Sequence, residues 1–217
     1  MLAALRKKTK PLTYFLARPF VMLGIHPNIV SFLAIPLILI AAYFIYMKSY
    51  LIATFFVLLA VMMDFIDGAV AELTKKKSYF GNYFETMIDK YVEMILIASF
   101  SFHYPVLSSL ALGFSLILSY AKPRVALVII TDNRDWPGIG EHADKFVIIL
   151  LFMLLASFVP HIFGFDAIEM MLWVLIIVTF IGGVQRIIYA KKLIEEAQRK
   201  GKILPYLKKD AGHDAVE

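Results

Sequence analysis

The sequence predicts an all-α integral membrane protein with six transmembrane helices and an N-terminal interfacial amphipathic helix. Two observations support this fold class. Of the 217 residues, 60% are hydrophobic and only 18% are charged, with a mean hydropathy of +0.75, far above the usual balance of soluble domains. The charged residues also gather in a few places and leave long uncharged runs, and a helix needs about 20 apolar residues to cross the hydrocarbon core.

The composition excludes several classes of protein. The chain has no cysteine, which excludes disulfide-rich secreted domains, thiolate metal sites and cysteine nucleophiles. A pI near 9.2 is compatible with nucleic-acid binding, but the basic residues lie beside apolar runs, where anionic headgroups are the nearer partner. We therefore expect membrane lipids as partners and no nucleic acid.

The first 26 residues predict a helix that lies on the membrane. Basic residues such as Arg6, Lys10 and Arg18 alternate here with Leu, Phe and Tyr, a composition typical of helices in the interface plane. We therefore assign residues 1–26 to an interfacial helix that does not span.

Six spans follow within residues 27–194, divided by charges, prolines and polar turns. The first begins at Pro27, because proline is favoured in the first turn of a helix. The glycine-containing stretch 131–140 predicts an aqueous loop, and residues 195–217 predict a polar tail. The spans are 27–47, 50–74, 79–102, a fourth ending near 130, 141–159, and a sixth that follows 160–165 and continues past 185 as a charged helix.

The distribution of basic residues predicts the orientation. Lys48 alone falls on one side, and the other 21 of the 22 Lys and Arg residues fall on the opposite side or just within its helix ends. Lys and Arg accumulate on the cytoplasmic side of membrane proteins. We therefore expect a multi-pass protein of the cell membrane with both termini, and the 75–77 and 131–140 loops, in the cytoplasm.

The second and third spans carry an unusual set of acidic residues. A charge at the centre of a transmembrane helix costs about 2.5–3.5 kcal/mol on insertion scales, so several carboxylates cannot all face lipid. We therefore expect them to face a hydrated cavity. They are Asp64, Asp67, Glu72, Glu85, Asp89 and Glu93.

The spacing of four of these carboxylates predicts a metal site. Asp64 and Asp67 share one helix face, and Glu85 and Asp89 share another. The short 75–77 turn brings the two faces together near the cytoplasmic surface, where four carboxylates would repel one another without cations. Ligands that are all oxygen select hard ions such as Mg²⁺ or Mn²⁺.

Small residues stand beside this site. Gly68, Ala71 and Gly81 leave backbone-close room for a bulky ligand. A divalent cation with adjacent space suits a phosphate ester or a pyrophosphate, because the metal neutralises charge during phosphoryl transfer.

These residues resemble the motif of the CDP-alcohol phosphotransferases, also named CDP-alcohol phosphatidyltransferases, which are membrane enzymes of phospholipid synthesis. The family pattern is D-x2-D-G-x2-A-R-x8-G-x3-D-x3-D, and residues 64–89 keep every spacing. Two positions differ. Glu85 stands where the family has Asp, and Glu72 stands where the family has Arg.

The resemblance implies a single displacement reaction and a homodimer. By this resemblance, Asp64, Asp67 and Glu85 would hold two Mg²⁺ or Mn²⁺ ions that bind the pyrophosphate of a CDP-alcohol, here a CDP-lipid. Asp89 would remove the proton of an acceptor hydroxyl, whose oxygen would attack the phosphorus that bears the alcohol, and CMP would leave. A fourth-ligand role for Asp89 stays open. The nucleotide residues implied by the resemblance are Asp64, Gly68, Ala71, Glu72 and Gly81.

A second, basic and polar cluster predicts an acceptor site. The run from Ser119 to Arg124 is similar to the Ser-Tyr-x-Arg-x-Arg-like run of family members that use an inositol phosphate acceptor. The basic residues have an alternative role as anchors at the cytoplasmic membrane surface. The candidate acceptor residues are Lys122, Arg124, His142, Lys145 and Arg186.

One alternative to an enzyme remains at this point. The chain could be a divalent-cation carrier of the membrane, or a homologue that lost its chemistry with the changes at Glu72 and Glu85. A carrier is expected to place its acidic site near the bilayer midplane, whereas these carboxylates cluster toward one end of their helices. The pattern therefore favours the enzyme.

Overall fold

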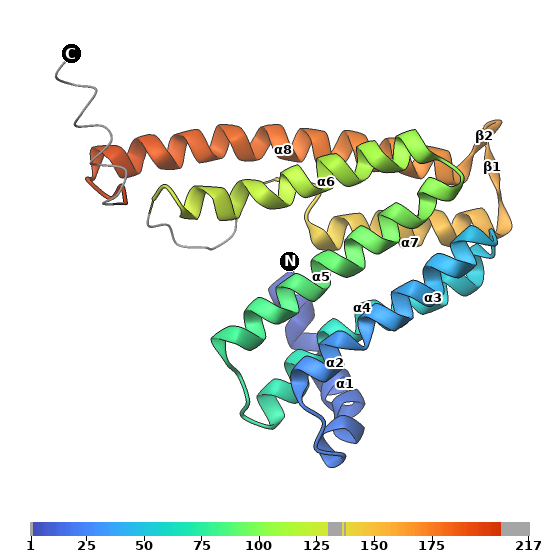
Figure 1. Cartoon of the computed structure of the whole chain (residues 1–217), viewed down its shortest axis with the longest axis horizontal. Helices are drawn as coiled ribbons and strands as arrows, with labels where there is room; N and C mark the ends of the chain where they lie inside the picture. The colour runs from blue at the N-terminus through green and yellow to red at the C-terminus, as the bar shows by residue number, and fades with distance from the viewer. Residues whose placement is uncertain (1, 130–135, 137, 205–217) are drawn as a thin grey trace. The chain divides into compact units, whose positions relative to one another are not determined.

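The apolar runs of the sequence form helices in the computed structural model, which describes residues 2–129, 136 and 138–204, with side chains described from Lys10 onward (Figure 1). The chain divides into two units, and each is described by itself. The first comprises residues up to Pro105 together with 150–167, and the second comprises 106–149 and the residues from Ile168 onward.

The first unit is built mainly from five helices. Helix α3 packs against α4 and α5, while α1 and α2 pack against α4. The elements are α1 (Leu2–Met22), α2 (Pro27–Phe32), α3 (Ala34–Tyr46), α4 (Tyr50–Leu73), α5 (Tyr79–Ser99), a 3₁₀ turn η1 (Phe100–Phe102), and a hairpin of β1 (His161–Ile162) and β2 (Phe165–Asp166). The predicted turn at 160–165 is therefore part of a short antiparallel hairpin in which His161 lies opposite Asp166.

Local sequence signals explain where the helices around the site begin. Pro27 opens α2, and His26 accepts a hydrogen bond from the Asn28 backbone N–H. The predicted span 27–47 is two helical pieces, α2 and α3, separated at Leu33. Ser78 caps α5, because its Oγ accepts from the backbone N of Gly81 at 2.9 Å.

The first unit has a core that joins α1 and α2 to the C-terminal half of α4. Ala17 of α1 and Val30 of α2 are fully buried, and they belong to one apolar cluster with Ile66, Ala69 and Val70 of α4. Helix α1 is therefore fixed against the end of α4 that carries the acidic residues. The helix that the sequence predicts before residue 27 is present, and its place at the membrane interface stays a prediction.

The second unit contains α6 (Pro105–Ala126) and α8 (Ala167–Arg199), and α7 (His142–Phe158) starts in it and continues into the first unit. Helix α6 ends four residues before the predicted end near residue 130. A second apolar cluster contains Val125, Ile129, Trp136 and Ala197. Part of the predicted 131–140 loop and the end of the predicted tail lie outside the described residues.

A close backbone contact joins residues 138–140 to α8. A Cβ atom at Gly182 would lie 2.1 Å from the carbonyl oxygen of Ile139, whereas one at Gly183 would meet no atom within 4 Å. Gly140, which has a φ of +80°, lies against Val178 of α8. Gly182 is therefore needed for packing inside the chain, a role that the sequence alone did not indicate.

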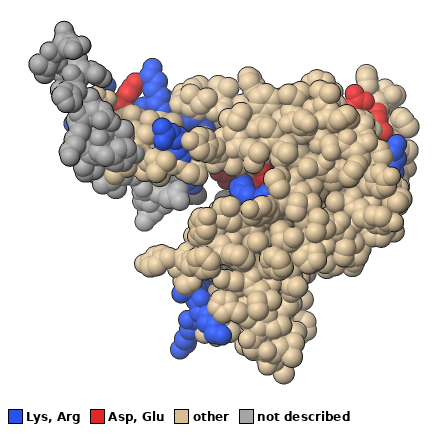
Figure 2. Space-filling model, viewed as in Figure 1, with Lys and Arg blue, Asp and Glu red and all other residues tan. Residues whose placement is uncertain are grey.

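Several helices have the length and apolarity of membrane spans. Among the described residues, four candidates are found: 27–46, 50–73, 105–126 and 167–199. The predicted third and fifth spans are also helices, but α5 carries Glu85, Asp89, Lys90 and Glu93, and α7 has only 17 residues. On the face shown in Figure 2, Lys, Arg, Asp and Glu gather in small groups, and uncharged residues form most of the surface between them. The chain is thus a helical membrane protein, and the count of six spans stays a prediction.

Candidate metal and nucleotide site

Helices α4 and α5 bring three carboxylates together. Asp64 and Asp67 lie one turn apart on α4, and Glu85 lies on α5; one carboxylate oxygen from each falls within 4.8 Å of the others. Helix periodicity and the short turn after α4 predict a group of four carboxylates, and these are three of the four. Three oxygen ligands at this spacing fit a hard divalent cation.

Asp67 has the environment expected of a cation ligand. Asp67 is only 3% exposed, and Ser31 of α2 donates a hydrogen bond to its Oδ2. Within residues 2–129, 136 and 138–204, its Oδ1 has no hydrogen-bond partner. A buried carboxylate oxygen without a partner is costly, so a cation held by Asp67, Asp64 and Glu85 fits the residues that are present.

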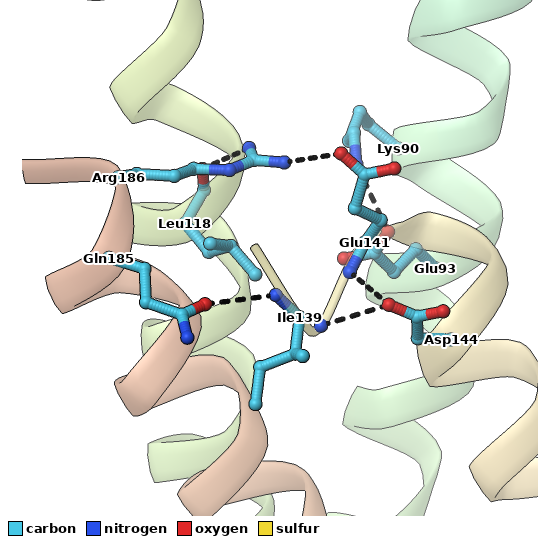
Figure 3. A network of polar contacts seen from close by, with 9 residues as sticks. Lys90, Glu93, Leu118, Ile139, Glu141, Asp144, Gln185 and Arg186 are labelled. Atoms are coloured by element: carbon cyan, nitrogen blue, oxygen red, sulfur yellow. Dashed lines mark hydrogen bonds and ion pairs between the residues drawn. The ribbon is translucent and has the colours of Figure 1, made fainter. Parts of the chain in front are cut away.

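The fourth predicted ligand, Asp89, interacts electrostatically with the other three carboxylates but does not converge with them. Asp89 is on α5, one turn after Glu85, and is partly buried. It belongs neither to the group of three converging carboxylates nor to the residues that line the adjacent cavity. One turn further on, Glu93 is buried and pairs with Lys90, with Nζ and Oε2 3.1 Å apart (Figure 3).

A cavity of about 590 Å³ adjoins the three carboxylates, within the size range of small-molecule sites. A Cβ atom at Gly68 would meet no atom within 4 Å, so the wall is open there. A Cβ atom at Gly81 would lie 3.0 Å from the Ser78 Oγ that caps α5. The motif residues that line the cavity are Asp64, Asp67, Gly68, Ala71, Glu72, Gly81 and Glu85.

Glu72 lies between two lysines on the wall of this cavity. Its Oε1 is 2.7 Å from Lys10 Nζ, and its Oε2 is 3.6 Å from Lys77 Nζ. The Lys10 ammonium also lies 5.3 Å from the centre of the Tyr14 ring. The hydrogen bond to Glu72 raises the pKa of Lys10 above its usual value, which keeps this group positively charged.

Sequence reasoning did not find Ser31, Lys10 or Asn28, which also line the cavity. Ser31 lies one turn after the Pro27-Asn28 helix start, and Lys10 lies on a basic segment that we assigned to membrane contact. Their neighbours at the site are distant in sequence, so helix periodicity carries no signal for them.

The predicted acceptor residues lie in the second unit, where two of them are buried. Lys145 is 1% exposed, and its Nζ donates to Ser115 Oγ of α6 at 2.6 Å. Arg186 is 7% exposed and donates to the backbone oxygen of Leu118 at 2.8 Å and to Glu141 Oε1 at 3.1 Å (Figure 3). The positively charged side chains of Lys145 and Arg186 are thus both bonded to other groups of the protein.

Side chains of α7 and α8 hold the segment that precedes α7 in place. Gln185 Oε1 accepts from the backbone N of Ile139 at 3.1 Å, and Asp144 Oδ2 accepts from those of Gly140 and Glu141 at 3.0 Å (Figure 3).

The other three candidate acceptor residues have different surroundings. Lys122 is partly buried and Arg124 is exposed, both near the end of α6. The His142 ring lies against Phe146, with 4.6 Å between ring centres.

Comparison with known proteins gives three findings. Residues 24–184 match the family model described as CDP-alcohol phosphatidyltransferase. The archaetidylinositol phosphate synthase of Pyrococcus horikoshii is 26% identical over 198 residues, which cover 90% of this chain and 99% of that protein. Structures of the Mycobacterium tuberculosis phosphatidylinositol phosphate synthase, both at 22% identity, have a similar fold. The structure with CDP-DAG has a TM-score of 0.71 and the alignment covers 83% of this chain and 94% of that one; for the structure with manganese and citrate the values are 0.70, 82% and 88%.

Proposed function

The chain belongs to the CDP-alcohol phosphatidyltransferase family, and on that premise we propose that it transfers the phospho-alcohol group of a CDP-lipid to an inositol phosphate and releases CMP. The observation that carries this proposal is the convergence of Asp64, Asp67 and Glu85 on a cavity of about 590 Å³. The Pyrococcus horikoshii relative, an archaetidylinositol phosphate synthase, supports the choice of acceptor.

The proposed cofactor is Mg²⁺ or Mn²⁺, as two ions. Asp64, Asp67 and Glu85 would hold them, with Asp89 as a further candidate ligand, and the open Oδ1 of Asp67 supports this assignment. The bound ions would neutralise negative charge on the donor's phosphates. The relative solved with manganese is consistent with this cofactor class.

The chain's own residues have the following proposed roles. Gly68 and Ala71 leave room under the cytidine, with Asp64, Glu72 and Gly81 around it. Asp89 accepts the proton of the acceptor hydroxyl. The acceptor oxygen bonds to the phosphorus that bears the lipid alcohol, and the bond from that phosphorus to the oxygen of CMP breaks.

The acceptor would bind beside Lys122, Arg124 and His142, because an anionic phosphate is well matched to Arg and Lys at a helix end. Lys145 and Arg186 would contribute to this site by holding its helices. Their bonds to Ser115, Leu118 and Glu141 support this role.

The proposed membrane arrangement has an interfacial helix in residues 1–26, a catalytic domain of six spans in 27–194, and a cytoplasmic tail in 195–217. The protein would be a multi-pass protein of the cell membrane, with its active site and both termini facing the cytoplasm. Because the chain has no cysteine, single Lys48→Cys and Lys75→Cys variants test the orientation with an impermeant maleimide. Labelling of Lys48→Cys on intact cells, and of Lys75→Cys only in inverted vesicles, is expected; the reverse would contradict it.

The activity itself is tested by CMP release. The purified protein is given CDP-diacylglycerol or its archaeal ether analogue, Mg²⁺ or Mn²⁺, and one acceptor at a time: inositol phosphate, inositol, glycerol phosphate or serine. Release of CMP that needs the metal and is fastest with inositol phosphate is expected, with Asp67→Asn as the inactive control. A protein that is stabilised by metal alone, does not respond to CDP and releases no CMP would be a cation carrier instead.

A further inference from the structure

The charged groups on the cavity wall are of both signs. Three carboxylates converge at one place, while Lys10, Lys76 and Lys77 line the same cavity with Glu72 among them. Glu72 pairs with Lys10 from α1 and with Lys77 from the turn after α4. An anionic ligand that also carries a divalent cation would meet complementary charge at both places.

The ion pairs of Glu72 are too exposed to add much to the folding stability of the protein. The side chain of Lys10 is 49% exposed, that of Lys77 67% and that of Glu72 40%, and exposed pairs of this kind contribute little to folding. What the pairs do is hold two flexible lysine side chains on the cavity wall. An ammonium group has three N–H donors, so a lysine that bonds to Glu72 keeps donors for a ligand.

We propose that Lys10 and Lys77 bind a phosphate of the CDP-lipid donor, and that Glu72 is the positioning residue that holds both. This inference rests on the proposed function. It also accounts for the position at which the family pattern has Arg and this chain has Glu72, because the positive charge reaches the cavity from α1 and from the turn after α4. A phosphate of a bilayer headgroup offers the same chemistry, and the experiment distinguishes the two sources.

The test measures binding of CDP, CMP and cytidine by thermal shift and calorimetry in one detergent, with Mg²⁺ at a fixed concentration. Lys10→Gln and Lys77→Gln should each weaken CDP binding about ten-fold, the lower end of what a charge-assisted hydrogen bond contributes, and leave cytidine binding unchanged. Lys75→Gln is the matched control, because it removes the same charge from the same turn and Lys75 does not line the cavity.

Glu72→Gln separates positioning from simple repulsion. If Glu72 only repels the anionic donor, its neutralisation strengthens CDP binding; as a positioning residue, its loss weakens binding about three-fold. Exchanging the charges of Lys10 and Glu72 tests the same pair in a second way. Lys10→Glu should weaken CDP binding more than ten-fold, and Lys10→Glu with Glu72→Arg should recover most of that loss.

Three outcomes would overturn the inference: CDP affinities equal to wild type in both lysine variants, stronger binding in Glu72→Gln, or a swap no better than Lys10→Glu alone. If the lysine variants keep their CDP affinity but bind vesicles rich in an anionic lipid more weakly, the lysines serve the bilayer. A wild-type protein that binds CDP but releases no CMP would contradict the proposed function, whereas the inference is judged on nucleotide binding.

Discussion

Ser31 and Asp67 are 36 residues apart in sequence and are joined by a hydrogen bond in which the Ser31 hydroxyl donates to Asp67 Oδ2. The bond links α2 to the carboxylate face of α4. It fixes the orientation of a buried side chain whose other oxygen, Oδ1, has no hydrogen-bond partner in the described part of the chain. Ser31 is therefore a candidate support for the metal site that the motif itself does not contain.

Ser31→Ala should weaken the affinity for Mg²⁺ or Mn²⁺ by about 5–150-fold, because loss of a hydrogen bond to a buried charged group costs about 1–3 kcal/mol. The metal dependence of CDP binding measures this effect. Ser31→Thr keeps a hydroxyl and should remain close to wild type. Equal metal affinity in Ser31→Ala and wild type would show that the hydrogen bond does not orient the ligand.

Asp64→Asn and Asp67→Asn should each reduce the rate of CMP release by more than about 100-fold. Each variant removes a negative ligand of the proposed cation, and such a cation stabilises the charge of the transition state by several kcal/mol. Metal-dependent CDP binding should fall as well. The rate of CMP release under saturating metal checks this prediction, and wild-type rates in either variant would remove the metal assignment.

Asp89→Asn should lower kcat by about 100-fold or more, the usual contribution of a general base, while CDP binding stays near that of wild type. Its position outside the group of three carboxylates is the reason to expect this separation. Single-turnover CMP release and CDP calorimetry measure the two properties. Joint loss of metal and CDP binding would make Asp89 a ligand.

Arg124→Ala and Arg186→Ala should differ in kind. Arg124 is exposed, so its loss should raise the KM for inositol phosphate and change the free energy of unfolding by less than about 0.5 kcal/mol. Arg186 is buried and holds Leu118 and Glu141, so its loss should destabilise the protein by about 1–3 kcal/mol. Thermal unfolding and acceptor kinetics check both; an unchanged KM in Arg124→Ala would leave Arg124 as a membrane-surface anchor.

Gly182→Ala and Gly183→Ala form a matched pair on α8. At Gly182 the new Cβ would lie 2.1 Å from the Ile139 carbonyl oxygen, so we expect a loss of about 1–3 kcal/mol, typical of overpacking. At Gly183 there is open space, and alanine should be neutral or stabilise the helix by up to about 1 kcal/mol. Thermal unfolding of the two variants in one detergent gives the difference; equal midpoints would contradict the contact.

The helices around the site could be predicted closely from the sequence. The expected span 50–74 is α4 (Tyr50–Leu73), because charges and a polar turn limit the apolar run at both ends. The convergence of Asp64, Asp67 and Glu85 follows from helix periodicity and from the short connection between two antiparallel helices. These features depend on neighbours in sequence, which is why they could be predicted.

The remaining parts of the site depend on contacts between distant residues. The bonds of Lys10 with Glu72, 62 residues apart, and of Arg186 with Leu118, 68 residues apart, have no counterpart in any local pattern. Basic residues near apolar runs were therefore all open to the same interpretation as membrane anchors. Burial distinguishes them, since Lys145 and Arg186 are enclosed and Arg124 is exposed.

The 33 residues of α8 have a mechanical consequence. At 1.5 Å per residue the helix is roughly 50 Å long, against a hydrocarbon thickness of roughly 30 Å, so even a tilted α8 extends well beyond the bilayer. We expect the part outside the bilayer to be the C-terminal third, which includes Ala197 and which would then stay helical in water. Val125, Ile129 and Trp136 pack around Ala197 and form a small apolar core for this part of the helix outside the bilayer. Urea and proteases should therefore open this end of the chain before they affect the lipid-embedded part.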